Sequence, residues 1–83
     1  MKFSATIHIM PRKEILDPQG KATLLGLKNL GLEDFDHLRI GKRIETELEA
    51  DSQEEATEKL TLACNKLLSN PIIEQYHFEL TQV

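Results

Sequence analysis

Basic side chains in two short loop segments are the residues of this chain best suited to specific chemistry. Arg12 and Lys13 follow a first segment of alternating apolar and polar residues, and Arg39, Lys42 and Arg43 lie near the middle of the chain. A guanidinium group holds a carboxylate or a phosphate through paired hydrogen bonds, and a lysine supplies a compact positive charge. These residues are therefore candidates for contact with a phosphate-bearing ligand or an acidic neighbour. Ordinary solubilising loop charge explains them equally well.

Three histidines, His8, His37 and His77, form a second candidate group. In the expected strands all three project to one face of a sheet, together with several glutamates. A metal ion needs at least three side chains that converge within about 2 Å of it, and the spacing of these residues does not provide that convergence. We therefore predict solvated or interfacial histidines and no metal site.

Catalytic motifs are missing from the sequence. It contains no phosphate-cradling glycine loop, no Gly-x-Ser-x-Gly nucleophile motif and no His-Glu-x-x-His zinc motif. Cys64 lies in an apolar helical stripe without a cationic neighbour, so we expect a buried thiol and not a nucleophile. We predict no catalytic residue and no cofactor-binding residue in this chain.

Length and charge narrow the class of protein. The 83 residues carry 10 basic and 14 acidic side chains, 40% apolar residues and a single cysteine, which is typical of one small soluble domain, placed at 1–83, in the reducing cytoplasm. A net charge of −4 and 5% aromatic residues disfavour binding to nucleic acid. The chain lacks the roughly 20 consecutive apolar residues of a membrane helix. Its charge is +3 through Arg43 and −7 from Ile44 onward, which a solvated surface or a charge-complementary subunit contact would explain.

Six elements are expected to position these residues. Alternation with a period of two predicts strands, and apolar residues at spacings of three and four predict helices. Asp17 and Ser52 have the character of N-terminal helix caps, and Gly31 that of a C-terminal stop. The expected elements are a strand over 2–10, a helix over 17–30, strands over Phe35–Ile40 and Arg43–Ala50, a helix over 52–69, and a strand over Ile73–Thr81.

This β-α-β-β-α-β order predicts an α+β fold. It is the order of a ferredoxin-like sandwich, whose four-stranded antiparallel sheet has the strand order 4-1-3-2 and carries both helices on one face. Because partners across neighbouring strands point to the same side, Ile40 should oppose Ile44, and Gly41-Lys42-Arg43 should form a three-residue loop or a bulge. The other face of the sheet is left open.

Three segments of the sequence together resemble the PurS small subunit of phosphoribosylformylglycinamidine synthase. The similarity runs nearly from end to end, in order and at the expected length, and it is weakest over Leu32–His37. It is carried by Met10-Pro11-Arg12-Lys13 with Leu16-Asp17-Pro18-Gln19-Gly20, by Arg39-Ile40-Gly41-Lys42 with Ile44-Glu45, and by the run from Cys64 to Tyr76.

The resemblance implies a non-catalytic subunit of an enzyme complex in the fourth step of purine biosynthesis. In such complexes a glutaminase subunit releases ammonia, and a large synthetase subunit uses ATP and Mg²⁺ to convert formylglycinamide ribonucleotide to formylglycinamidine ribonucleotide. The small subunit, a dimer or higher homo-oligomer, joins the two and assists ammonia transfer. The implied partners are therefore a second copy of the chain, the glutaminase and the synthetase, and the implied cofactors belong to the synthetase.

The loops and turns that carry the resemblance are also the expected contact or positioning elements. They comprise the basic residues of both loop segments and neighbouring turn residues: Arg12, Lys13, Asp17, Arg39, Gly41, Lys42, Arg43, Asn70 and Pro71.

Two other classes of function fit the same topology. A small-ligand-sensing regulatory module would bind its ligand through a glycine-rich loop after the first strand, and residues 11–16 contain no glycine. An acylphosphatase-like enzyme would hold phosphate with a loop arginine in the place of Arg12, but no glycine-rich phosphate nest accompanies it.

Overall fold

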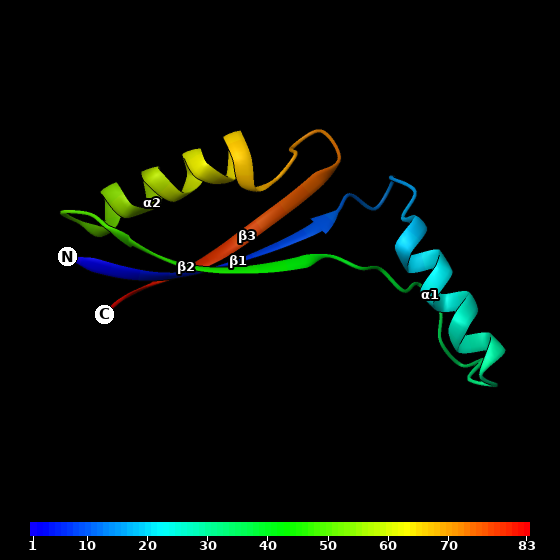
Figure 1. Ribbon diagram of the computed structural model, residues 1–83. Helices are drawn as coiled ribbons and strands as arrows, with labels where there is room; N and C mark the ends of the chain where they lie inside the picture. The colour runs from blue at the N-terminus through cyan, green and yellow to red at the C-terminus, as the bar shows by residue number, and fades with distance from the viewer.

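The computed structural model describes residues 1–83 as an elongated α+β molecule of 52 × 26 × 14 Å. Three antiparallel strands and two helices follow one another in the order β-α-β-α-β (Figure 1). Neither helix combines the length and the apolar character that crossing a bilayer requires. The elements are β1 (Lys2–Pro11), α1 (Pro18–Asn29), β2 (Lys42–Glu49), α2 (Gln53–Ala63) with a π-helical turn, η1 (Cys64–Leu68), and β3 (Glu74–Gln82).

Strand β1 is the centre of the sheet, whose order is β2-β1-β3. Ile7 stands opposite Ile44 on one side and opposite Phe78 on the other, so all three side chains point to the face that α2 covers. His8 and the other alternate residues of β1 point to the open face. The sequence predicted this alternation and both neighbours of the first strand, and both predictions are confirmed.

The core lies between β1 and α2 and is small. Only ten of the 83 residues are buried. Ile7 and Ile9 of β1 pack with Leu60 and Cys64 on the helix side, and Phe3 packs in a second cluster with Ala50 and Ala56. Half-buried side chains of β2 and β3 flank both clusters. Burial of Cys64 raises the pKa of its thiol, which agrees with the expectation of a packed and unreactive cysteine.

Helix α2 begins and ends as its sequence predicts. Ser52 caps it, with its Oγ accepting a hydrogen bond from the N–H of Glu55 at 3.1 Å. The helix continues into η1, where the N–H and the Oγ of Ser69 both donate to the carbonyl of Cys64, at 3.0 and 2.9 Å. These two hydrogen bonds to one carbonyl end the helix just before Asn70.

The expected strand over Phe35–Ile40 is wrong. His37 has a left-handed backbone conformation with a φ of 54°, which interrupts an extended run. The backbone N–H of Ile40 donates to Asp17 Oδ2 at 2.9 Å, so it is not available to a neighbouring strand. The sheet therefore has three strands where four were expected, and the outer edge of β2 is unpaired.

The loop or bulge expected at Gly41-Lys42-Arg43 is wrong for the same reason. Lys42 and Arg43 belong to β2 and stand opposite Ile9 and His8. Gly41 passes so close to β1 that a Cβ at this position would collide with the carbonyl oxygen of Ile9. Glycine is needed here for a close approach of two backbones and not for a turn.

Helix α1 does not lie on the sheet, so the expectation of two helices on one face is also wrong. It projects beyond the ends of the strands, whereas α2 covers the sheet (Figure 1). Its inner side faces the segment that returns to β2: Gly20 is buried, and a Cβ there would lie 2.6 Å from the carbonyl oxygen of Leu38. The helix packs on this returning segment because Asp17 binds both of them, as described below.

Both predicted caps of α1 are present. Asp17 Oδ1 accepts a hydrogen bond from the N–H of Gly20 at 3.0 Å. At the other end Gly31 has a φ of 85°, and the N–H groups of Gly31 and Leu32 donate back to carbonyls of the last turn at 3.0 Å. The helix is thus well terminated even though it lacks a sheet to pack on.

The two sides of α2 differ in burial, which leads to a prediction about stability. Leu60 is 3% exposed and packs in the core, whereas Leu62, two residues on, is 59% exposed. We expect Leu60→Ala to lower the free energy of unfolding by about 2–5 kcal/mol and Leu62→Ala by about 0.5 kcal/mol or less. Urea unfolding at one protein concentration measures both, and equal losses would contradict the assigned core.

The hydrogen bonds to Asp17 predict how the stability of the fold depends on pH. Hydrogen bonds from the N–H groups of Ile40 and then Gly20 lower the pKa of this carboxyl below its ordinary value of 3.8. Its contribution to stability is therefore complete above pH 3.8 and is lost as the pH falls through the lower folded-state pKa. Asp17→Asn should reduce stability at neutral pH, and its difference from the wild type should shrink below pH 3.8.

The matched control for this change is Asp34→Asn, because Asp34 is exposed and makes no hydrogen bond or ion pair. Its unfolding curves should follow those of the wild type. A difference between Asp17→Asn and the wild type that stayed constant from pH 7 to pH 3 would show that the Asp17 charge does not hold α1 in place.

Candidate functional site

Most of the predicted contact residues gather at one end of the sheet, where β1 ends and β2 and β3 begin. This end also carries the start of α1. We call the hydrogen-bonded group that joins these elements the polar joint. It consists of Arg12, Asp17, Arg39 and Asn70 with the backbone groups they bind.

Arg12 links the corner before β3 to the end of β1 through hydrogen bonds. Its backbone N–H donates to the carbonyl of Ile73 at 2.9 Å. Its Nε and Nη2 both donate to the carbonyl of Pro71, at 3.0 and 2.7 Å. The Arg12 guanidinium is therefore engaged with a carbonyl of its own chain, and its role here is to position the Asn70-Pro71 corner.

Asp17 and Arg39 fasten α1 and the returning segment. Each carboxylate oxygen of Asp17 accepts one backbone N–H, from Gly20 of α1 and from Ile40. Arg39 lies beside it and donates through Nη2 to the carbonyl of Pro11 at the end of β1. One carboxylate and one guanidinium thus fix the direction in which α1 leaves the sheet.

Asn70 completes the joint, and Lys42 lies close to it. Asn70 Oδ1 accepts from the N–H of Ile72 at 3.2 Å, and its own N–H donates to Glu74 Oε1 at 2.7 Å. Lys42 Nζ lies 3.9 Å from Glu74 Oε2. Arg43 lies apart from the joint, on the open face of β2, with Nη2 3.5 Å from the carboxylate of Glu45.

The histidines do not converge as a group. His8 and His77 stack on the open face with ring centroids 4.8 Å apart, and His8 Nε2 lies 3.3 Å from Glu79 Oε1. The expected open-face position is wrong for His37, because its segment is not part of the sheet. No group of three His, Cys, Asp or Glu side chains lies close enough to bind a metal ion.

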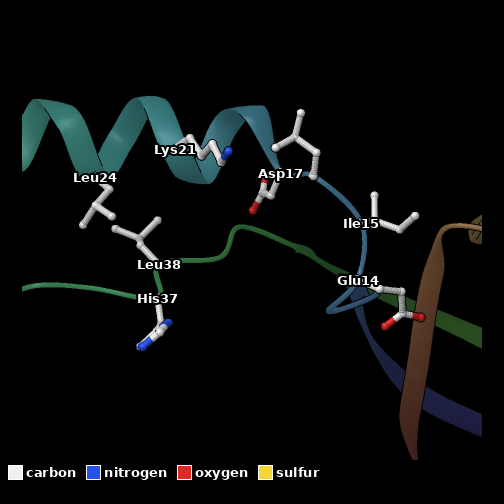
Figure 2. A pocket seen from close by; sticks show the side chains of 8 residues that line it. Glu14, Ile15, Asp17, Lys21, Leu24, His37 and Leu38 are labelled. Carbon is white, nitrogen blue, oxygen red and sulfur yellow. The ribbon is translucent and has the colours of Figure 1, made fainter.

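Two adjoining cavities lie at the base of α1. The first, which we call the basic pocket, has a volume of about 450 Å³ and is lined by Lys13, His37, Leu38 and Arg39. The second, the α1 pocket, has a volume of about 440 Å³ and shares His37 and Leu38 with the first. Figure 2 shows Leu24 and Leu38 pointing toward each other across it, with His37 directed away from the helix. Its other lining residues are Glu14, Ile15, Leu16, Asp17 and Lys21.

A third cavity lies between the unpaired edge strand and the helix that covers the sheet. This β2–α2 groove has a volume of about 450 Å³ and a mostly apolar lining. Ile44 and Leu48 line it from the strand, and Leu60, Ala63 and Leu68 from the helix side.

The sequence did not predict which groups bind one another within the joint. Arg12 and Arg39 were expected to meet a ligand or an acidic neighbour; within the chain both bind backbone carbonyls, and Arg39 also lies beside Asp17. The second role of Asp17, toward Ile40, had no sequence signal beyond its helix cap. His37 was assigned to the wrong face, and only the left-handed tolerance of histidine could have suggested a break there.

Comparison with known proteins assigns the chain to a family. A family model described as PurS, phosphoribosylformylglycinamidine (FGAM) synthase, matches residues 4–82. The FGAM synthase subunit PurS of Synechocystis is 40% identical over 79 residues, which are 95% of this chain and 79% of the relative.

Solved structures give the same answer. Thermus thermophilus PurS is 39% identical with a TM-score of 0.80, and the match covers 100% of this chain and 99% of that one. A chain in the structure of PurLQS from Thermotoga maritima is 32% identical with a TM-score of 0.87, over 98% of this chain and 99% of that one. With its family model, its relatives and its three-stranded fold in agreement, this chain belongs to the PurS family, the small subunit of FGAM synthase.

Proposed function

We propose that this PurS chain acts by contact, joining the glutaminase and synthetase subunits of the FGAM synthase complex so that ammonia passes between them. The FGAM synthase reaction belongs to purine biosynthesis and is a ligase reaction of a multi-subunit complex. The observation that carries the proposal is the polar joint. Its charged groups bind the chain's own backbone and hold α1 away from the sheet. The surfaces of α1 and of the sheet are therefore left exposed.

The chemistry of ammonia explains why such a subunit is useful. Ammonia that escapes into water is protonated and is no longer a nucleophile, so the site that releases it and the site that uses it must be held together behind a closed passage. A joining subunit needs shape and contact surface and no reactive group. The similarity to a chain of the PurLQS structure supports an assembly with PurL and PurQ.

The remaining chemistry is proposed to lie in the other subunits. ATP and Mg²⁺ would act in the large synthetase subunit, which activates the amide oxygen for attack by ammonia, and no cofactor would bind to this chain. We propose a cytoplasmic location, because the single thiol, Cys64, is free and such thiols are typical of reducing compartments.

We further propose that a second copy of the chain completes the fold. The β2–α2 groove and the unpaired edge of β2 mark the places where a ferredoxin-like sandwich would have its missing strand and helix. An unpaired edge beside an apolar groove is a common site for another chain. A homo-oligomer would therefore restore the ferredoxin-like sandwich that a single chain does not form.

Helix α1 of the second copy has the right surface for this groove. Its outward side exposes Leu25, which is 60% exposed, between Lys21 and Lys28, and the helix carries no acidic residue. The edge strand β2 carries three glutamates, among them Glu45 and Glu47, which line the groove. Apolar side chains would meet in the groove while the lysines of one copy face the glutamates of the other.

The acylphosphatase-like alternative finds no support at its key residue. Both the Nε and the Nη2 of Arg12 donate to the carbonyl of Pro71, so this arginine does not face an open phosphate site. A regulatory ligand-binding module would need a glycine-rich loop after β1, and residues 11–16 lack glycine. Contact between subunits is the function that the geometry supports best.

Reconstitution tests the joining function. Glutaminase and synthetase mixed without this chain should show glutamine-dependent synthesis lowered by roughly tenfold or more, whereas synthesis from added ammonium salt at high concentration should be nearly unchanged. Adding the chain should restore only the glutamine-dependent rate. Full glutamine-dependent activity in its absence would refute the joining function.

Variants of α1 test the proposed self-association. Leu25→Asp places a charge where an apolar contact is proposed and should shift the chain toward the monomer in sedimentation equilibrium, by about tenfold in dissociation constant or more. Leu62→Asp, at an equally exposed leucine on the outer side of α2, is the matched control and should associate like the wild type. The α1 contact is ruled out if Leu25→Asp also associates like the wild type.

A further inference from the structure

We propose that the basic pocket and the α1 pocket together bind a segment of a partner subunit in which an acidic side chain stands next to aliphatic ones. This inference rests on the proposed joining function and names the kind of segment that one contact surface accepts. The two cavities adjoin each other because His37 and Leu38 line both of them. A single short segment can therefore occupy the two at once.

No acidic residue lines the basic pocket. Three of its four lining residues are Lys13, His37 and Arg39, and neither Lys13 nor Arg39 takes part in any ion pair of the chain. The acidic neighbours of the pocket are Asp17, which lies beside Arg39, and Asp36, whose Oδ1 lies 3.9 Å from His37 Nε2, with the side chains of Asp36 and His37 largely exposed. Two permanent positive charges thus face an open cavity, and an incoming carboxylate would complement them.

The Arg39 guanidinium is held in position before any ligand binds. Its Nη2 donates to the carbonyl of Pro11, which leaves its other N–H groups free to donate to a ligand. Ile40, the next residue, is held by Asp17, so the segment that carries His37 and Arg39 is fixed at its end. Less ordering is therefore needed on binding than for a basic residue on a free loop.

The α1 pocket supplies an apolar surface next to this charge. Leu24 and Leu38 lie across the cavity from each other (Figure 2), while Ile15 and Leu16 line it from the loop and are exposed. Exposed apolar side chains beside a cavity mark sites of protein contact more often than sites for fully polar ligands. The pocket therefore accepts one or two aliphatic side chains next to the acidic one.

A nucleotide fits these cavities less well. Neither lining contains a phenylalanine, tyrosine or tryptophan on which a base could stack. The N–H of Gly20 at the start of α1, which could otherwise help to hold a phosphate, already donates to Asp17. A carboxylate carried by a polypeptide is the occupant that both the charge and the apolar lining favour.

Peptide titration of the isotope-labelled full chain tests the proposal. The probes are the hexapeptide Ser-Gly-Asp-Leu-Leu-Ser and its counterpart with Asn in place of Asp, at millimolar concentration, followed by amide chemical shifts. We expect the Asp peptide to shift the amides of residues 13–16 and 37–39 and to bind on the order of tenfold more tightly than the Asn peptide. Lys13→Glu should abolish this preference, and Lys66→Glu, at an exposed lysine outside both pockets, should keep it.

Any of the following results would overturn the proposal. Equal affinity for the two peptides would remove the acidic determinant, and an equal loss in Lys66→Glu would show a general effect of net charge. If sodium phosphate at the same concentration shifted the same amides and competed fully with the Asp peptide, the site would be one for small anions. The amide spectrum of each variant reports its folding in the same measurement.

Reconstitution separates this inference from the proposed function. Lys13→Glu should raise the concentration of the chain needed for half-maximal glutamine-dependent activity by about tenfold, and excess variant should restore the full rate. An unchanged half-maximal concentration would refute the pocket while leaving the joining function intact. Loss of the joining function itself would instead appear as a rate that does not depend on this chain at all.

Discussion

The backbone N–H of Ile40 can be donated only once, and the rest of the molecule depends on where it goes. Bound to Asp17 at 2.9 Å, it ties the returning segment to the start of α1 and withholds that segment from the sheet. The same carboxylate caps α1 through Gly20. The unpaired edge of β2, the position of α1 beyond the strands and the pockets at its base all follow from this pair of hydrogen bonds to one carboxylate.

This arrangement leaves the molecule with a small core. The buried side chains come almost entirely from β1 and α2, and several large apolar residues outside them, including Leu16, Leu30 and Phe35, are more than two-fifths exposed. In a chain of this length the buried fraction is low even for a compact fold. Much of the apolar surface that would form an interior in a larger domain is here available to neighbouring chains, which suits a subunit whose role is contact.

Sequence reasoning succeeds where structure is decided locally and fails where a distant group decides it. The alternation of β1, the Ser52 cap and the Gly31 stop are all local, and each is observed. The run Phe35–Ile40 has the composition of a strand, but Asp17, more than twenty residues upstream, takes the N–H that pairing would need. For the site, the sequence draws attention to the basic loops, whose role in subunit contact stays a prediction. The partner of Arg12 could not be predicted, because a backbone carbonyl such as that of Pro71 leaves no trace in the sequence.

The π-helical turn at Cys64–Leu68 bears on how the chain tolerates changes in length. A turn closed by a bond from Ser69 back to Cys64, five residues earlier, holds one residue more than an α-helical turn. Loss of one residue there would leave a regular helix that still reaches the Asn70-Pro71 corner. Loss of one residue from the middle of β1 would turn Ile7 outward and His8 inward for the rest of the strand. Insertions and deletions among homologous chains are therefore expected to collect at the end of α2 and to be rare in the central strand.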